Sequence, residues 1–216
     1  MLLAIDTCGS IGTIALARRS GEEIAVLGMA ELASKTHSAM LVLRLRELLE
    51  AHHVSLQRIE AIIIVNGPGS FTGVRVGVSA IKGLAEVFAT PVIAVSRLRV
   101  LAHKVETQYA ALDAGRGEFY FRDDALASRE ALLSFEELRD ELQWVTPLHT
   151  LAACEEKVAG AFPEASLVEA PTASDALAVA LPRLLSGDFD DLASLDGNYL
   201  RRSDAELFGA PARKTR

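Results

Sequence analysis

Three short stretches of this chain could do chemistry, and each lies at a glycine-rich turn. In the longest, residues 66–75, three glycines and a proline separate an apolar β-branched run from a helical pattern. Pro68 fixes its φ angle, glycine allows a close backbone approach, and Ser70 or Thr72 can cap the helix. The turn lacks the signatures of a P-loop or a GxGxxG loop. An anion site of the phosphate type and a purely structural turn both remain open. This motif turn comprises Gly67, Pro68, Gly69, Ser70, Phe71, Thr72, Gly73 and Arg75.

The other two stretches carry an acidic residue at the end of a predicted strand, just before a glycine-containing hairpin. Asp6 and Thr7 end the first apolar run, and Asp113 and Glu118 flank a second hairpin of the same kind. An aspartate at the end of a strand often only caps a turn, so each position alone is a weak signal. The repetition suggests two duplicated halves.

The histidines and cysteines do not form a metal-binding pattern. Paired ligands on one helix need a spacing of three or four residues, and the residue four after His37 is Leu41. His52 and His53 are adjacent, and two cysteines are too few for a disulfide or metal framework. We therefore expect no metal site in this chain.

Apolar patterning predicts an α/β protein with two lobes, each a mixed sheet flanked by helices. The first lobe, residues 1–106, reads as three antiparallel strands followed by alternating helices and strands. The second and smaller lobe covers residues 107–216, and its last helix is a candidate to pack back on the first lobe. The predicted strands are 1–7, 13–17, 23–29, 59–65, 90–96 and a hairpin within 110–121, with a further strand at Val168. The predicted helices are 36–53, 74–88, 99–105, 134–142 and 174–185.

The helix over residues 74–88 is apolar on nearly all sides and has only a narrow polar stripe. Such a helix is buried on two sides. It is either a central helix of its own lobe or a helix that packs against a partner subunit. We favour the partner, and Gly77→Leu or Ala80→Glu is then expected to abolish pairing without unfolding. The predicted partner face comprises Met40, Leu43, Val76, Gly77, Ala80, Gly83 and Val87.

Composition narrows the function classes. Half of the 216 residues are hydrophobic, and the formal net charge of −7 makes broad nucleic-acid binding by this chain alone unfavourable. No apolar run reaches membrane-spanning length, and the N-terminus lacks the features of a signal peptide. These observations predict a cytoplasmic protein.

Several segments together resemble the TsaB (YeaZ) family of bacterial tRNA threonylcarbamoyladenosine biosynthesis proteins. The resemblance spans almost the whole chain, and its most specific part is the motif turn. Two departures are visible: Cys8 stands where the family usually has Ser, and Gly115 replaces a common Arg. The matching segments are Ala4-Ile5-Asp6-Thr7, Thr36-His37-Ser38, residues 66–77, Lys82-Gly83-Leu84-Ala85, Asp113-Ala114, Gly117-Glu118, Tyr120 and Asn198-Tyr199-Leu200-Arg201.

The resemblance implies an actin-like (ASKHA) two-lobed fold that has lost its catalytic function. TsaB is the partner of the homologous subunit TsaD, which holds the metal and transfers a threonylcarbamoyl group to the adenosine beside the tRNA anticodon. TsaE, an ATPase, joins them, and TsaB alone forms homodimers through its first-lobe helices. Catalytic residues and cofactors of its own are then absent, ATP and metal belong to the partner subunits, and tRNA is reached through the complex. Asp6, Thr7, Asp113 and Glu118 would be vestigial positions of a nucleotide cleft.

Two other functions remain as alternatives. A nucleotide-dependent phosphotransferase would use Asp113 and its hairpin on phosphates, and Asp6→Ala would then abolish activity; the favoured hypothesis expects that variant to be nearly silent. A metallopeptidase would need a zinc constellation that the sequence lacks.

Overall fold

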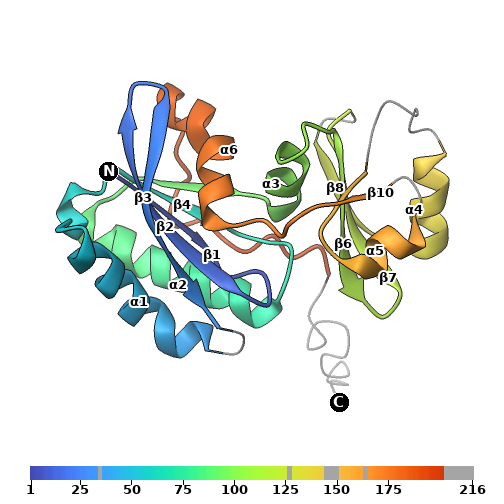
Figure 1. Ribbon diagram of the computed structural model, residues 1–216, viewed down its shortest axis with the longest axis horizontal. Helices are drawn as coiled ribbons and strands as arrows, with labels where there is room; N and C mark the ends of the chain where they lie inside the picture. The colour runs from blue at the N-terminus through green and yellow to red at the C-terminus, as the bar shows by residue number, and fades with distance from the viewer. Residues whose placement is uncertain (34–35, 126–127, 144–150, 163–164, 202–216) are drawn as a thin grey trace, which may run out of the picture.

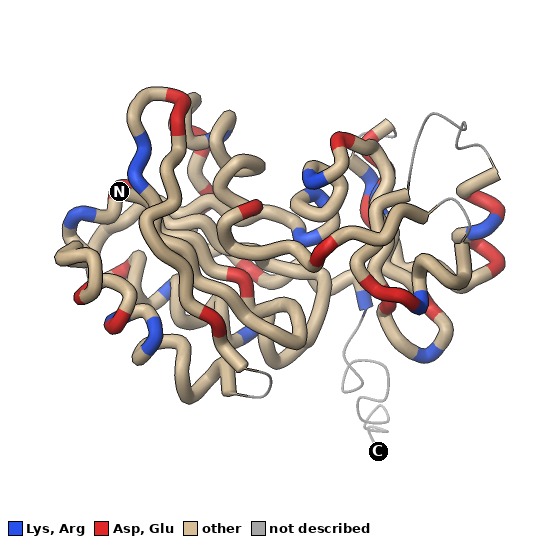
Figure 2. Tube along the Cα trace, in the orientation of Figure 1, with Lys and Arg blue, Asp and Glu red and all other residues tan. Residues whose placement is uncertain are grey.

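The computed structural model describes residues 1–33, 36–125, 128–143, 151–162 and 165–201. Two lobes lie side by side, and each is a five-stranded mixed sheet with helices on both faces (Figure 1). The two-lobed α/β architecture predicted from the sequence is confirmed. Acidic and basic residues are interspersed over both lobes (Figure 2). No helix in the described ranges is both long and apolar enough to cross a membrane.

The first sheet has the strand order β3-β2-β1-β4-β5. The first three strands are antiparallel, and β1, β4 and β5 run parallel, so their carboxyl ends meet at one edge. Helices α1 and α2 cover one face, and α6 covers the other (Figure 1). The elements are β1 (Leu2–Asp6), β2 (Gly12–Ser20), β3 (Glu23–Leu32), α1 (His37–Ala51), the 3-10 turn Leu56–Arg58, β4 (Ala61–Val65), α2 (Phe71–Phe88), β5 (Val92–Val95) and α6 (Ala173–Ser186).

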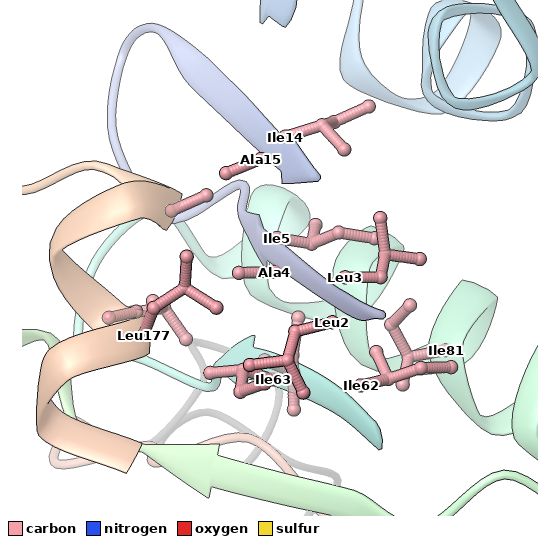
Figure 3. Packing of buried hydrophobic residues seen from close by; sticks show 14 of the residues in the cluster. Leu2, Leu3, Ala4, Ile5, Ile14, Ala15, Ile62, Ile63, Ile81 and Leu177 are labelled. Atoms are coloured by element: carbon pink, nitrogen blue, oxygen red, sulfur yellow. The ribbon is translucent and has the colours of Figure 1, made fainter. Parts of the chain in front are cut away.

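Strands β1 and β4 are buried on both faces, which explains their continuous apolar sequence. Leu3 of β1 points toward α2, where Ile81 lies, and Ala4 points toward Leu177 of α6 (Figure 3). The side chains of Leu3, Ile81 and Leu177 are each at most 2% exposed. The first core is therefore two apolar layers that share one sheet.

The second sheet has the order β10-β9-β6-β7-β8, with β8 at an edge. One face packs on α4 and α5 around Phe121 and Phe162. The other face packs on α3 around Leu101 and Leu112. The elements are α3 (Arg97–His103), β6 (Tyr109–Gly115), β7 (Glu118–Asp123), β8 (Arg129–Ser134), α4 (Phe135–Leu142), β9 (Leu151–Ala153), α5 (Glu156–Ala161) and β10 (Ala165–Leu167).

Two helices link the lobes. Helix α3 packs mainly on the second sheet, although it precedes residue 107, while its Val100 contributes to the core of the first lobe. Helix α6, from the C-terminal half, buries its apolar side on the first sheet. Residues 188–201 then return along the first lobe to the second, so packing units and chain order do not coincide.

Some boundaries predicted from the sequence were wrong. Helix α2 begins at Phe71 and α3 at Arg97, because Ser70 and Ser96 are the N-terminal cap positions. Strands β8 and β9 and helix α5 were missed: β9 and α5 are only three and six residues long, and β8 is half-buried and lacks a clear apolar alternation. The apolar pattern of residues 36–53 predicts Val42 on the core face of α1 beside Leu41, but Val42 is 65% exposed.

Candidate functional site

A cleft of about 840 Å³ opens between the two lobes. The carboxyl ends of β1 and β4 supply one wall, as expected for ligand sites of open α/β sheets. The second lobe supplies the other wall with its β6–β7 hairpin and the end of β9. The lining residues used below are Cys8, His37, Ser70, Arg97, Asp113 and Glu155.

The loop after β1 and the motif turn lie in direct backbone contact. The Ser70 N–H donates to the Cys8 carbonyl oxygen at 2.8 Å, and the Thr7 hydroxyl donates to the Gly73 carbonyl oxygen at 2.7 Å. A Cβ at Gly69 would lie 2.5 Å from the Cys8 oxygen, and one at Gly73 would overlap the Thr7 oxygen. These glycines are required because two backbones share the space that a side chain would need.

The start of the motif turn is held in the same way. Gly67 has φ +113°, which favours glycine, and its carbonyl oxygen accepts from the Arg97 N–H at 2.6 Å. The Asn198 N–H donates to Asn66 at 2.7 Å, so the C-terminal segment closes the other side. Ser70 caps α2 by accepting from the Gly73 N–H at 3.3 Å, as the sequence predicted. The three turn glycines thus serve contacts within the chain.

The Asp6 carboxylate does not face an open ligand site. It is 1% exposed, accepts the Cys8 N–H at 2.7 Å, and lies 3.6 Å from Arg97 Nε. Burial opposes the positive charge of Arg97, but the carboxylate of Asp6 outweighs it, and the pKa of Arg97 is raised. The chain neutralises Asp6 with its own guanidinium.

Arg97 was not singled out from the sequence. The available signal was its position directly after β5, since β1, β4 and β5 are adjacent and parallel and their carboxyl ends converge. A cation at that point in the chain lies at the same sheet edge as Asp6 and is a candidate partner for it.

Across the cleft, Asp113 is also paired. Its carboxylate accepts from Lys157 Nζ at 2.7 Å and from the Gly115 N–H at 2.8 Å. Burial alone would raise the pKa of Asp113, but the bonds from Lys157 and Gly115 lower it below its usual value. Glu155 accepts the Asp113 N–H at 3.1 Å, yet burial raises the pKa of Glu155.

We predict that Lys157→Ala raises the pKa of Asp113 toward its usual value of about 4. In the unaltered chain the depressed pKa contributes stability that is fully present above about pH 4 and is lost as the pH falls through the folded-state pKa. A carboxyl NMR titration of the two proteins measures the shift. An unchanged Asp113 titration in the variant would contradict the ion pair.

The β6–β7 hairpin, which has Gly115 in place of the Arg expected from the family resemblance, is contacted by Arg201 from the C-terminal segment. Arg201 donates to the Gly115 carbonyl oxygen at 3.2 Å and forms an ion pair with Glu118. The second-lobe hairpin is therefore contacted by an arginine, although Gly115 replaces Arg within it. Glu118 is half-buried and engaged in this pair, outside the residues that line the cleft.

Neither thiol in the cleft forms a thiolate readily. Burial raises the pKa of Cys8 well above its usual range, and burial with the nearby Glu155 raises the pKa of Cys154 to about 12. His37 is 8% exposed, and its Nε2 lacks a hydrogen-bond partner among the described residues. Within the described ranges, no three His, Cys, Asp or Glu side chains cluster as metal ligands would.

The predicted partner face divides into exposed and buried positions. Val87 is 75% exposed, Gly83 is exposed, and the remaining positions on α1 and α2 are half-buried, apart from Gly77. Gly77 is fully inside the first lobe, where a Cβ would overlap the Thr7 hydroxyl and lie 3.2 Å from Ile64. Its assignment to a partner face was wrong, and Gly77→Leu would disrupt the lobe itself. The half-buried positions are Met40, Leu43, Val76 and Ala80.

Comparison with known proteins identifies the family. The model of the family described as TsaD, tRNA N6-adenosine threonylcarbamoyltransferase, matches residues 29–139, just over half of the chain. A Haemophilus influenzae protein named tRNA threonylcarbamoyladenosine biosynthesis protein TsaB is 38% identical over 126 residues, covering 56% of this chain and 52% of that protein. The Escherichia coli protein of the same name is 33% identical over 128 residues, covering 56% and 54%. The chain spans about half the length of these curated relatives.

The fold comparison extends over nearly the whole chain. A crystal structure described as an uncharacterized protein with similarity to peptidase YEAZ from Pseudomonas aeruginosa is 26% identical. It aligns with a TM-score of 0.76 and covers 93% of this chain and 99% of that one. Sequence and fold agree, and the chain belongs to the TsaD family of tRNA N6-adenosine threonylcarbamoyltransferases, on its TsaB (YeaZ) side within the actin-like ATPase superfamily.

Proposed function

We propose that this chain is a non-catalytic subunit required for threonylcarbamoyl transfer to the adenosine beside the tRNA anticodon. It acts as the heterodimer partner of a TsaD-like catalytic subunit, together with a TsaE-like ATPase, in the cytoplasm. The relatives named TsaB biosynthesis proteins support the pathway. The family's transferase name supports a partner that carries out the reaction.

One observation carries the non-catalytic role: the three acidic residues at the predicted nucleotide-cleft positions, Asp6, Asp113 and Glu118, are engaged by cations of the same chain. Asp6 is buried beside Arg97, and Asp113 is bound to Lys157. A general base needs a free lone pair within reach of its substrate, and a metal ligand needs an uncompensated carboxylate. The charge of each carboxylate is compensated within the chain, which disfavours both roles.

The subunit then needs no nucleotide or metal of its own, and ATP and metal are held by its partners. Its formal charge of −7, with acidic residues spread over both lobes (Figure 2), favours contact with tRNA through a complex. The contribution of this chain is then a surface on which the catalytic subunit docks.

That surface is the outer side of α1 and α2. The two helices contact each other on the same face of the first sheet, and Val42 and Val87 are exposed apolar residues, 65% and 75% accessible. Small residues at Ala80 and Gly83 allow another helix to approach closely. A helix pair of this kind suits a four-helix bundle with the equivalent helices of a TsaD-like subunit, or of a second copy when the chain is alone.

We predict that Val87→Glu weakens pairing at least 100-fold while the chain stays folded, because a carboxylate on the predicted partner face would be buried without a hydrogen-bond or charge partner. Val26→Glu is the matched control, since Val26 on β3 is also exposed, at 44%. Sedimentation velocity with the TsaD-like subunit measures both. If Val87→Glu and Val26→Glu pair with the TsaD-like subunit with equal affinity, α2 is not part of the interface.

Reconstitution tests the function. The TsaD-like and TsaE-like subunits, tRNA, ATP and the threonylcarbamoyl donor are incubated with or without this chain. We expect product only with it, and we expect Asp113→Asn to support a rate within about threefold of the unaltered chain. A loss of rate in Asp113→Asn with normal pairing would show that the cleft takes part in the reaction.

A further inference from the structure

One carboxylate joins three segments of the chain at the junction of the lobes. Glu130 lies on β8, the edge strand of the second sheet. Its Oε1 accepts from the Ser96 hydroxyl at 2.5 Å and from Arg122 at 2.5 Å. Its Oε2 accepts from the Asn198 side-chain amide at 2.6 Å. The side chain is only 10% exposed, so these bonds are shielded from water.

The two donors from outside the second sheet both reach the motif turn. Ser96 follows β5 in the first lobe and begins α3, and the next residue donates its N–H to Gly67. Asn198 donates its own N–H to Asn66, and its carbonyl oxygen faces Gly67. Glu130 therefore holds the second lobe against the base of the motif turn.

The side chain of Ser96 bonds to Glu130 and does not cap its own helix. A serine at the N-terminal cap of a helix ordinarily accepts a backbone N–H, but Ser96 makes no side-chain capping bond. Its hydroxyl reaches across to Glu130 in the other lobe instead. Hydrogen bonds to an ionised carboxylate are stronger than neutral ones. The Ser96 hydroxyl is therefore used for the interlobe bond and not for capping α3.

Arg122 keeps the carboxylate in place. Arg122 is 4% exposed, lies on β7, and also binds Asp124 at 2.5 Å. The carboxylate of Glu130 is therefore oriented by a residue of its own lobe as well as by its contacts to the first lobe. Other polar ties also join α3 to the first lobe, and one of them, the Asp6–Arg97 pair, is shielded as well, with both side chains less than 10% exposed. The ion pair of Lys104 with Asp175 links α3 to α6, with side chains 19% and 29% exposed.

We propose that Glu130 is an interlobe latch that fixes the angle between the two lobes and the width of the cleft. Removing its bonds to Ser96 and Asn198 lets the second lobe move relative to the motif turn, while each sheet stays intact. This inference concerns the conformation of the chain and does not depend on the proposed function.

The test is a distance distribution between spin labels on the two lobes. Labels at Arg58→Cys and Glu136→Cys, both exposed, are measured by double electron–electron resonance in a Cys8→Ser, Cys154→Ala background. We expect Glu130→Gln to broaden the distribution at least twofold. Ser96→Ala, which leaves the Arg122 pair intact, should broaden it in the same direction. Glu141→Gln is the control, because its ion pair with Arg129 lies on the surface of the second lobe.

Hydrogen exchange of the same variants separates a latch from a general support of the fold. Backbone amides of β4 and β7 should keep their protection, while Asn198 should exchange at least tenfold faster. If the interlobe distance distributions of Glu130→Gln and Ser96→Ala are identical to that of Glu141→Gln, the proposal is overturned. So would loss of protection in both sheets, because Glu130 would then stabilise the fold as a whole.

Discussion

Replacing Gly73 with alanine is expected to lower the free energy of unfolding by about 3 kcal/mol, among the largest effects of any single methyl group in this chain. The added Cβ would overlap the backbone oxygen of Thr7, which cannot rotate away as a side chain could. Relief requires α2 to move off β1, and the hydrogen bond from the Thr7 hydroxyl to the Gly73 oxygen is then lost. The expected fall in Tm is about 6–12 °C for a protein of this size.

Gly83→Ala is the matched control, because Gly83 lies in the same helix and a Cβ there meets nothing within 4 Å. Alanine is the better helix former, so this variant should gain up to about 1 kcal/mol. Urea unfolding of both proteins measures the difference. Shifts of the same sign and size would show that α2 does not lie against the loop after β1 as described.

Arg97→Ala is expected to destabilise the chain by about 3–5 kcal/mol, because it leaves the carboxylate of Asp6 buried without a counter-charge. Both side chains are less than 10% exposed, so water cannot replace the guanidinium. For the same reason Asp6→Ala, expected from the sequence to leave tRNA modification largely intact, should destabilise the fold. Asp6 is a structural residue at the base of the cleft.

The control is Arg46→Ala, which removes an exposed helical ion pair with Glu50 and should change stability by no more than about 0.5 kcal/mol. Replacing both Asp6 and Arg97 by Asn and Gln should recover part of the loss, since neither amide carries a charge. Denaturant unfolding of Asp6→Asn, of Arg97→Gln and of the variant that carries both substitutions gives the coupling energy between the two side chains. Additive losses in the double variant would contradict a direct interaction between the two residues.

The sequence predicted the first lobe well because its elements are long and strongly patterned. β1 and β4 are continuous apolar runs, and α2 is a long helix with a capping serine. The second lobe was predicted less completely. β9 and α5 are three and six residues long, which is too short for periodicity to appear, and β9 pairs with β6, which lies about 40 residues earlier in the chain.

The site shows the same division. Asp6, the motif turn and the Asp113 hairpin were recognised because glycine and aspartate mark turns locally. Their partners were not recognised, because Arg97 and Lys157 follow Asp6 and Asp113 by 91 and 44 positions in the chain, and only Arg97 carries an indirect signal, its place after β5. Gly77 was assigned to the wrong side of α2 for a related reason. A small residue permits close approach on either side, and only the position of Thr7 shows which side is used.

Mass spectrometry of tRNA nucleosides from cells depleted of this protein tests the central claim most directly. We predict that threonylcarbamoyladenosine is lost, that the unaltered chain and Val26→Glu restore it, and that Val87→Glu does not. Undiminished threonylcarbamoyladenosine in the depleted cells would contradict the proposed role in tRNA modification.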